Sequence, residues 1–149
     1  MDRPLFAHGP LGDPDLLAAV LGRSIPPALL LPACAPGFAA LSLAEGRRAA
    51  LVRRPGEAAG GLVLLALSGF EVDLLDAFEA EHCFRGIVPV MIEEELHEAD
   101  AYRPRAAARE MAEAWSLSGW QLSHRTVALD AAKTAATALR ARLIAIRPH

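Results

Sequence analysis

A short segment near the middle of the chain gathers side chains that could carry out acid–base or nucleophilic chemistry. The segment LLDAFEAEHCFR, residues 74–85, contains Glu79, His82, Cys83 and Arg85. A carboxylate in an apolar setting can act as a general base, because burial raises its pKa toward neutral pH. The apolar residues before Glu79 predict an amphipathic helix that ends near it. Glu79 is therefore either solvated at the helix end or directed into a pocket.

The residues that follow Glu79 favour other roles. His82 and Cys83 are adjacent in sequence, and adjacent side chains usually point apart, whereas a nucleophilic cysteine–histidine pair must meet in space. Arg85 is expected to form an ion pair, with Glu79 or Glu81 as candidate partners. An ion pair with Glu79 would lower the pKa of that carboxyl group and weaken it as a base.

A strand and a helix are predicted at the N-terminus. Residues 4–8, PLFAH, are typical of a short buried strand that ends at Gly9-Pro10. His8, at the end of this strand, is more often a structural group than an acid or base in such a position. The next segment predicts a helix with Asp13 as N-cap, Pro14 at its first position and Gly22 as its left-handed end.

The central part of the chain predicts strands separated by loops and one more helix. Residues 25–46 contain four prolines and predict short extended segments and loops, and a turn is expected at Pro55-Gly56. The apolar run GLVLLAL, residues 61–67, predicts a central strand buried on both faces. Ser68 is placed to cap the following helix, with Glu71 completing a capping box.

The last third of the chain predicts a hairpin followed by helices. Residues 87–92 form one hairpin strand, the acidic run Glu93–Glu95 lies near the turn, and residues 98–103 return. The remainder is mostly helical in pattern, with a bend expected at SLSGW, residues 116–120.

This order of elements predicts an α+β fold, a small mixed β-barrel-like sheet with peripheral helices. The 149 residues suit a single domain, with residues 1–105 as its core and residues 106–149 as a helical C-terminal extension.

Composition excludes several classes of protein. Apolar residues make up 53% of the chain and the net charge is −3, so a folded core is expected. The cluster of Arg47, Arg48, Arg53 and Arg54 is too small and too interrupted to form a nucleic-acid footprint. The longest apolar run is too short to span a membrane, and no signal peptide precedes the domain. Cys34 and Cys83 form no C-x-x-C motif, so we expect no structural metal site, and reduced thiols suit a cytoplasmic protein.

Three segments together resemble the γ-glutamylcyclotransferase-like family, which includes the AIG2-like proteins. Residues 4–23 resemble its first strand, Tyr-Gly-x-Leu loop and helix. Residues 61–90 resemble its central strand, the helix that ends in Leu-Asp-x-x-Glu and a strand entered through Tyr-x-Arg. Residues 99–104 resemble its return strand. The C-terminal segment 113–124 is similar to tails that follow this domain in bacterial proteins fused to a Nudix ADP-ribose pyrophosphatase, some named for tellurite resistance.

The resemblance implies an enzyme that cyclises a γ-glutamyl amine to 5-oxoproline and releases the amine. The α-amino group attacks the γ-carbonyl of the same glutamyl unit, and a base must take its proton. Glu79 matches the glutamate of Leu-Asp-x-x-Glu and would be this general acid/base. The implied ligand is a small anionic γ-glutamyl compound, and no cofactor is implied. The substrate-binding residues implied are His8, Gly9, Pro10, Leu11, Cys83 and Arg85.

The sequence also departs from the family pattern. His8 stands in place of the loop tyrosine, Pro10 has no N–H to donate, and Cys83 stands in place of the tyrosine of Tyr-x-Arg. Arg85 and Glu79 are retained. A catalytically inactive domain that binds a small ligand, or a protein partner, therefore remains the alternative. A second copy of the chain and a Nudix protein are the partners left open.

Overall fold

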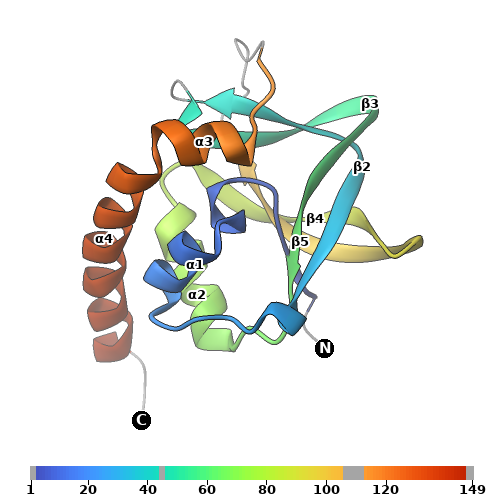
Figure 1. Ribbon diagram of the computed structural model, residues 1–149. Coiled ribbons are helices and arrows are strands. Elements are labelled where there is room, and N and C mark those ends of the chain that lie inside the picture. The colour runs from blue at the N-terminus through green and yellow to red at the C-terminus, as the bar shows by residue number, and fades with distance from the viewer. Residues whose placement is uncertain (1–2, 44–45, 106–112, 147–149) are drawn as a thin grey trace.

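The computed structural model describes residues 3–43, 46–105 and 113–146 and combines strands with helices (Figure 1). This confirms the prediction of a mixed α+β fold. Short 3-10 helices lie at Pro10–Gly12 and Pro27–Leu29. The longer elements are β1 (Leu5–Ala7), α1 (Pro14–Leu21), β2 (Leu30–Leu43), β3 (Arg48–Leu64), α2 (Gly69–Glu79), β4 (Cys83–Ile92), β5 (Glu95–Pro104), α3 (Leu117–Ser123) and α4 (Arg125–Ile146).

The five strands form one sheet that closes into a barrel in the order β1-β3-β2-β4-β5. Neighbouring strands are antiparallel, except that β1 and β5 pair in parallel where Leu5 meets Asp100. Figure 1 shows α1, α2 and α4 together on one side of this sheet, with α3 above them. The first strand therefore belongs to the part of the barrel wall that faces the helices.

The molecule has two apolar clusters, and the short strand β1 contributes to both because it is buried on both faces. Phe6 points into the barrel, where it packs with Val63 and Val88. Leu5 and Ala7 point the other way and pack with residues of the helices. Alternate residues of a strand face opposite sides, so the apolar run that includes Val63 and Leu64 contributes to both clusters. The prediction of a doubly buried strand at this place is confirmed for Val63 and Leu64.

Gly61 allows β3 to approach β1 closely, and its replacement is expected to destabilise the fold. A Cβ atom at position 61 would lie 2.4 Å from the carbonyl oxygen of Ala7 and 3.0 Å from the ring of Phe6. Backbone cannot move aside as a flexible side chain can, so Gly61→Ala should lower the free energy of unfolding by about 1–3 kcal/mol. Urea denaturation would measure this loss. Gly60→Ala is the control, because a Cβ at position 60 meets no atom within 4 Å; equal stability of both variants would contradict the expectation.

The prediction of loops and short segments over residues 25–46 is wrong, because β2 is one continuous strand of 14 residues. It pairs with β3 along its length, but with β4 only where Cys34 meets Met91. A proline lacks an N–H, and prolines are tolerated in strands where that donor would face an unpaired edge. Pro32 and Pro36 therefore fit into β2 without ending it.

The expected turn at Pro55-Gly56 is also wrong. Strand β3 is 17 residues long in all and includes Pro55 and Gly56. Its register against β2 shifts between Pro36 and Phe38. Gly37 and Gly56, on the two strands, both have positive φ angles, of 82° and 88°. Glycine adopts this conformation readily, so the two residues form an irregularity within a long ribbon instead of reversing the chain.

Several local predictions are confirmed. The side chain of Asp13 accepts hydrogen bonds from the N–H groups of Asp15 and Leu16 at the start of α1, and Gly22 ends that helix in the left-handed conformation. Ser68 and Glu71 form the capping box of α2.

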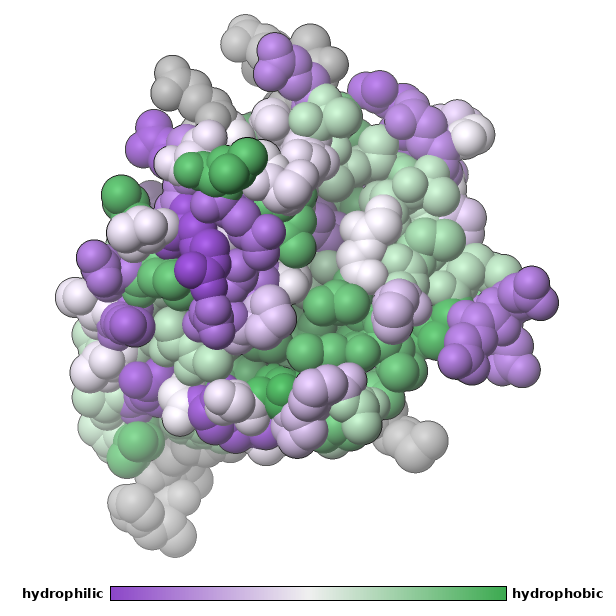
Figure 2. All heavy atoms as spheres, viewed as in Figure 1, coloured by the Kyte–Doolittle hydropathy of each residue, from purple (hydrophilic) through white to green (hydrophobic). Residues whose placement is uncertain are grey.

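The predicted hairpin is confirmed as well. Its strands β4 and β5 are joined at Glu93 and Glu94, which both have positive φ angles, as a tight hairpin turn requires. Figure 2 shows hydrophilic residues at the tip of this hairpin, on the right of the view, and both glutamates are exposed.

The C-terminal helices differ from the prediction. Residues 116–120 do not bend the chain; Ser116 caps α3 by accepting a hydrogen bond from the N–H of Gly119. The break falls instead at His124, between α3 and α4. The part of the predicted extension at residues 106–112 lies outside the described residues.

Candidate functional site

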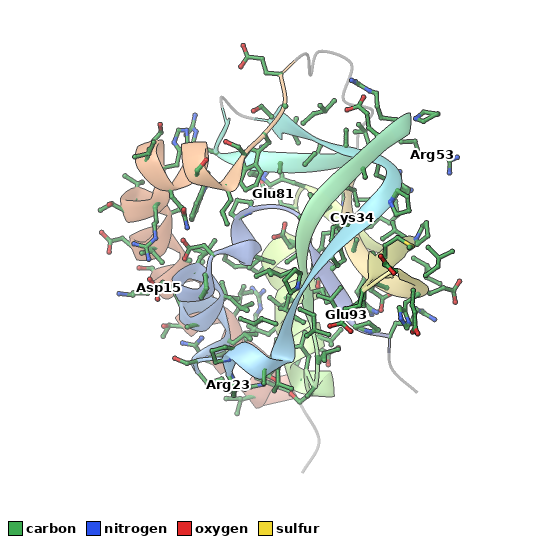
Figure 3. The ribbon with its side chains drawn as sticks, turned by 45° about the vertical axis from the view of Figure 1, so that its right-hand side comes forward. Asp15, Arg23, Cys34, Arg53, Glu81 and Glu93 are labelled. Atoms are coloured by element: carbon green, nitrogen blue, oxygen red, sulfur yellow. The ribbon has the colours of Figure 1, made fainter. Side chains whose placement is uncertain are left out.

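A cavity of about 350 Å³ lies where the loop after β1, the end of α2 and the beginning of β4 meet the C-terminal helices. Its walls include His8, Gly9, Pro10 and Leu11 from the loop, and Glu79, Glu81 and Cys83 from the predicted chemical segment. Glu81 is labelled in Figure 3. Arg48, Tyr102, Trp120 and alanines of α4 complete the lining. The fold therefore brings together five of the predicted binding residues with the predicted base.

Glu79 is the last residue of α2, and its carboxyl group is poised to titrate near neutral pH. Burial raises its pKa to about 6, although a hydrogen bond with Cys83 and the positive charge of Arg48 act in the opposite direction. Residues Leu74 and Leu75 on the same helix are fully buried, so the packing of α2 fixes its end against the cavity. Glu79 is thus a carboxylate that can both take and return a proton close to physiological pH.

The raised pKa of Glu79 predicts a pH-dependent cost in stability. The folded state prefers the neutral carboxyl group, so nothing is lost below the ordinary pKa, and stability falls as pH rises through about 6. At pH 8, Glu79→Gln should unfold with a free energy up to about 2 kcal/mol larger than the parent. The two proteins should be equally stable near pH 4. Denaturation curves at both pH values would show this, and an equal difference at both would exclude an ionisation effect.

Cys83, the first residue of β4, acts on Glu79 as a hydrogen-bond partner. Burial, together with the charge of Glu79, raises the pKa of its thiol to about 11. A thiol with this pKa is protonated at neutral pH, and only the thiolate is a good nucleophile. His82 lies instead 3.6 Å from the carboxylate of Glu81. The geometry therefore agrees with the expectation that His82 and Cys83 do not form a nucleophilic pair.

The loop after β1 lines the same cavity. The N–H of Gly12 donates to the carbonyl of Gly9 at 2.9 Å, which folds the loop into a 3-10 turn. Among the backbone hydrogen bonds found for the described residues, none uses the N–H of Gly9 or Leu11 as donor. A Cβ atom at Gly9 would lie 3.3 Å from Cβ of Ala49, so glycine lets the loop pack against β3.

His8 is buried in the wall of this cavity and is uncharged at neutral pH. Burial lowers its pKa to about 4, although a hydrogen bond with the backbone of Ala49 acts in the opposite direction. Its ring stacks on Phe6, with 6.3 Å between ring centroids. A neutral imidazole can exchange hydrogen bonds with a ligand but cannot supply a positive charge to an anion.

Arg85 is placed away from the cavity of Glu79, and the expected ion pair with Glu79 or Glu81 is wrong. Its Nε atom lies 3.0 Å from Asp76 Oδ1 and its Nη1 atom 3.1 Å from Asp100 Oδ2. Arg85 instead lines a second cavity of about 320 Å³. One of these carboxylates comes from α2, and the other comes from β5, which pairs directly with β4. Glu79 consequently does not lose basicity to this guanidinium.

Asp76, on α2, has a tertiary hydrogen-bond partner. The hydroxyl group of Tyr102 donates to Asp76 Oδ1 at 2.7 Å. Burial and the negative charge of Asp76 raise the pKa of Tyr102 well above its usual range. Tyr102 lines both cavities, so this contact, together with Arg85, forms the partition between them.

Three residues of the cavity were missed by the sequence analysis. Tyr102, the only tyrosine of the chain, lies in the return strand, and its uniqueness was the one available signal. Trp120, buried at 2% exposure, belongs to α3, and its place beside the site was not predicted. Arg48 is one of four arginines between residues 47 and 54, and nothing in its local pattern distinguishes it from the others.

Within the described ranges, no group of three or more histidine, cysteine, aspartate or glutamate side chains is arranged to hold a metal ion. Of the helices in the same ranges, none is long and apolar enough to cross a bilayer.

Comparisons with known proteins give similarity at the level of fold. No protein family model matches the chain, and no curated protein matches it significantly in sequence. The solution structure of At5g39720.1 from Arabidopsis thaliana is similar, with a TM-score of 0.67 and 22% identity over 99% of this chain and 95% of that one. The solution structure of At3g28950.1 from the same plant has a TM-score of 0.66 and 19% identity over 88% of this chain and 79% of that one. These likenesses show a shared fold.

Proposed function

We propose that the protein is a γ-glutamylcyclotransferase-like enzyme that converts a γ-glutamyl amine into 5-oxoproline and a free amine, with Glu79 as general acid/base. The observation that carries the proposal is the position of half-buried Glu79, with a pKa of about 6, in a cavity that Gly9 and Leu11 of the loop after β1 also line. The resemblance of residues 4–104 to this family supports the same reaction.

The reaction would use the two sides of the cavity in sequence. Ionised Glu79 accepts a proton from the neutral α-amino group as its nitrogen attacks the γ-carbonyl carbon and forms the new C–N bond. The N–H groups of Gly9 and Leu11 are suited to stabilise the oxyanion that develops on the carbonyl oxygen. Glu79 then returns the proton to the leaving nitrogen as the original amide C–N bond breaks. The atoms balance without a further reactant.

Incubation of the purified protein with γ-glutamyl amino acids and glutathione would test the proposal. Release of 5-oxoproline would be followed by mass spectrometry, with the matching α-glutamyl peptides as negative substrates, because their γ-carboxyl groups are not amides. We expect product only from the γ-linked compounds. Absence of product across the panel, from protein shown to be folded, would count against cyclotransferase activity.

The proposed base also predicts the pH dependence of the reaction. Since Glu79 must be ionised to accept a proton, kcat/KM should fall tenfold for each pH unit below about 6. Initial rates measured between pH 4.5 and 8 would show the break. A break near the ordinary glutamate pKa, or none, would mean that a group other than buried Glu79 is the base.

A binding function without catalysis is the second candidate, and Pro10 is the observation in its favour. Pro10 forms the first position of the 3-10 turn and has no N–H, so this loop offers one anion contact fewer than a loop with an ordinary residue there. Binding of 5-oxoproline without turnover of any γ-glutamyl compound would support this candidate.

A further inference from the structure

Buried nitrogen atoms without hydrogen-bond partners are concentrated around one cavity. In the described part of the chain, four side-chain nitrogens have this property, and they belong to His8, Arg48, Arg103 and Trp120. All of these residues except Arg103 line the cavity that contains Glu79. An unpaired buried polar group destabilises the folded state, so native structures seldom keep several together without a role.

The chemistry of two of these atoms indicates what they would bind. Arg48 Nε and Trp120 Nε1 are hydrogen-bond donors and cannot accept. A ligand that satisfies them must therefore present acceptor atoms, and a guanidinium binds carboxylate oxygens with particular strength. His8 is neutral and offers no charge to compete for this anion.

Arg48 is the cationic residue whose charge acts on Glu79. It is the first residue of β3, opposite Leu43 of β2, and its positive charge lowers the pKa of Glu79. The two residues do not approach within ion-pair distance, since Arg48 is absent from the ion pairs found in the described residues. The cavity thus holds a cation and a carboxylate that face common space without neutralising each other by contact.

We infer that Arg48 binds the α-carboxylate of the ligand while Glu79 faces its α-amino group, so that the site selects γ-glutamyl compounds with a free α-carboxylate. This inference rests on the proposed function. The α-amino and α-carboxylate groups share one carbon atom, so their binding residues must face one cavity, and Arg48 and Glu79 line the same one. Arg48 also provides the anion contact that Pro10 cannot provide.

Two small lactams isolate the contribution of the carboxylate. 5-Oxo-L-proline and 2-pyrrolidinone have the same ring, and only the first carries a carboxylate. NMR titrations of the parent protein should give a Kd for 5-oxo-L-proline that is about 10- to 100-fold lower than for 2-pyrrolidinone, the effect of a charge-assisted hydrogen bond. Arg48→Gln should remove this preference and leave the weak binding of 2-pyrrolidinone unchanged.

Matched variants keep the test specific. Arg53 lies on the same strand, is exposed, and appears in Figure 3 on the part of the β2–β3 ribbon away from the helices. Arg53→Gln should retain the full preference for the carboxylate. Arg48→Lys keeps the charge but loses the planar donor pair, so it should retain part of the preference, and it provides the test if Arg48→Gln does not fold.

The outcomes separate this inference from the proposed function. A carboxylate preference that survives in Arg48→Gln, or a parent protein that binds neither lactam, overturns the inference even if 5-oxoproline is released from γ-glutamyl substrates. A preference that depends on Arg48, in a protein that releases no 5-oxoproline, supports the inference and removes only the catalytic proposal.

Discussion

Glu79→Gln should lower kcat/KM for 5-oxoproline release by about 10²- to 10⁴-fold, the usual contribution of a positioned acid–base group. Glutamine keeps the size of the side chain but cannot take a proton from the α-amino group or return one to the leaving amine. The fold should remain intact, because the neutral side chain is the form that the buried position prefers. Mass spectrometry of 5-oxoproline, with initial rates at pH 7.5, would measure the loss.

Glu98→Gln is the control for this variant. It makes the same chemical change on β5, where Glu98 is exposed, and it should retain the parental rate. If Glu79→Gln kept more than a tenth of the parental kcat/KM, another group would have to carry the proton, and Glu79 would be a structural residue of the cavity.

Asp13→Ala should lower the free energy of unfolding by about 3 kcal/mol, because one buried carboxylate connects two distant helices. Asp13 caps α1 through Oδ1, and its Oδ2 accepts hydrogen bonds from Gln121 Nε2 and Arg125 Nε, each at 2.9 Å. Burial opposes its ionisation, but these hydrogen bonds hold the pKa of Asp13 below its ordinary value. Thermal and urea denaturation would measure the loss.

Two further variants separate the contributions of Asp13. Asp15 contacts the same arginine from an exposed position, labelled in Figure 3, with 71% of its side chain accessible. Asp15→Ala should cost less than about 1 kcal/mol, since exposed ion pairs contribute little. Asp13→Asn keeps the cap and loses the charge, so it should fall between the other two. Equal losses for Asp13→Ala and Asp15→Ala would show that burial of the first carboxylate is unimportant.

Asp13 also shows which of a residue's interactions can be predicted from its neighbours in the sequence. Its role as N-cap follows from its place before Pro14 and a run of apolar residues, since capping depends only on the next three residues. The link to Gln121 and Arg125 joins positions more than a hundred residues apart, and no local pattern encodes it. The same holds for Glu71, whose capping box was predicted but whose two hydrogen bonds from Arg23 were not.

The wrong predictions share a physical cause. Prolines and glycines were interpreted as ends of strands, yet β2 and β3 continue through Pro36 and Gly56. Whether a proline ends a strand depends on which edge its nitrogen faces, and that edge is set by the neighbouring strands. The pairing between β2 and β3 extends from Leu30 with Leu64 to Leu43 with Arg48, and this long antiparallel pairing overrides the local preference.

Features whose signals lie within a few residues could be predicted from local pattern: the capped helices, the β4–β5 hairpin, the strand buried on both faces, and Glu79 as the candidate base. Which side chains share a cavity follows only from the folded structure. In the folded protein, Arg85 forms ion pairs with Asp76 and Asp100, and Arg48 lines the same cavity as Glu79. Charge pairing is decided by distance in space, and that distance is set here by closure of the barrel and by the packing of the helices against it.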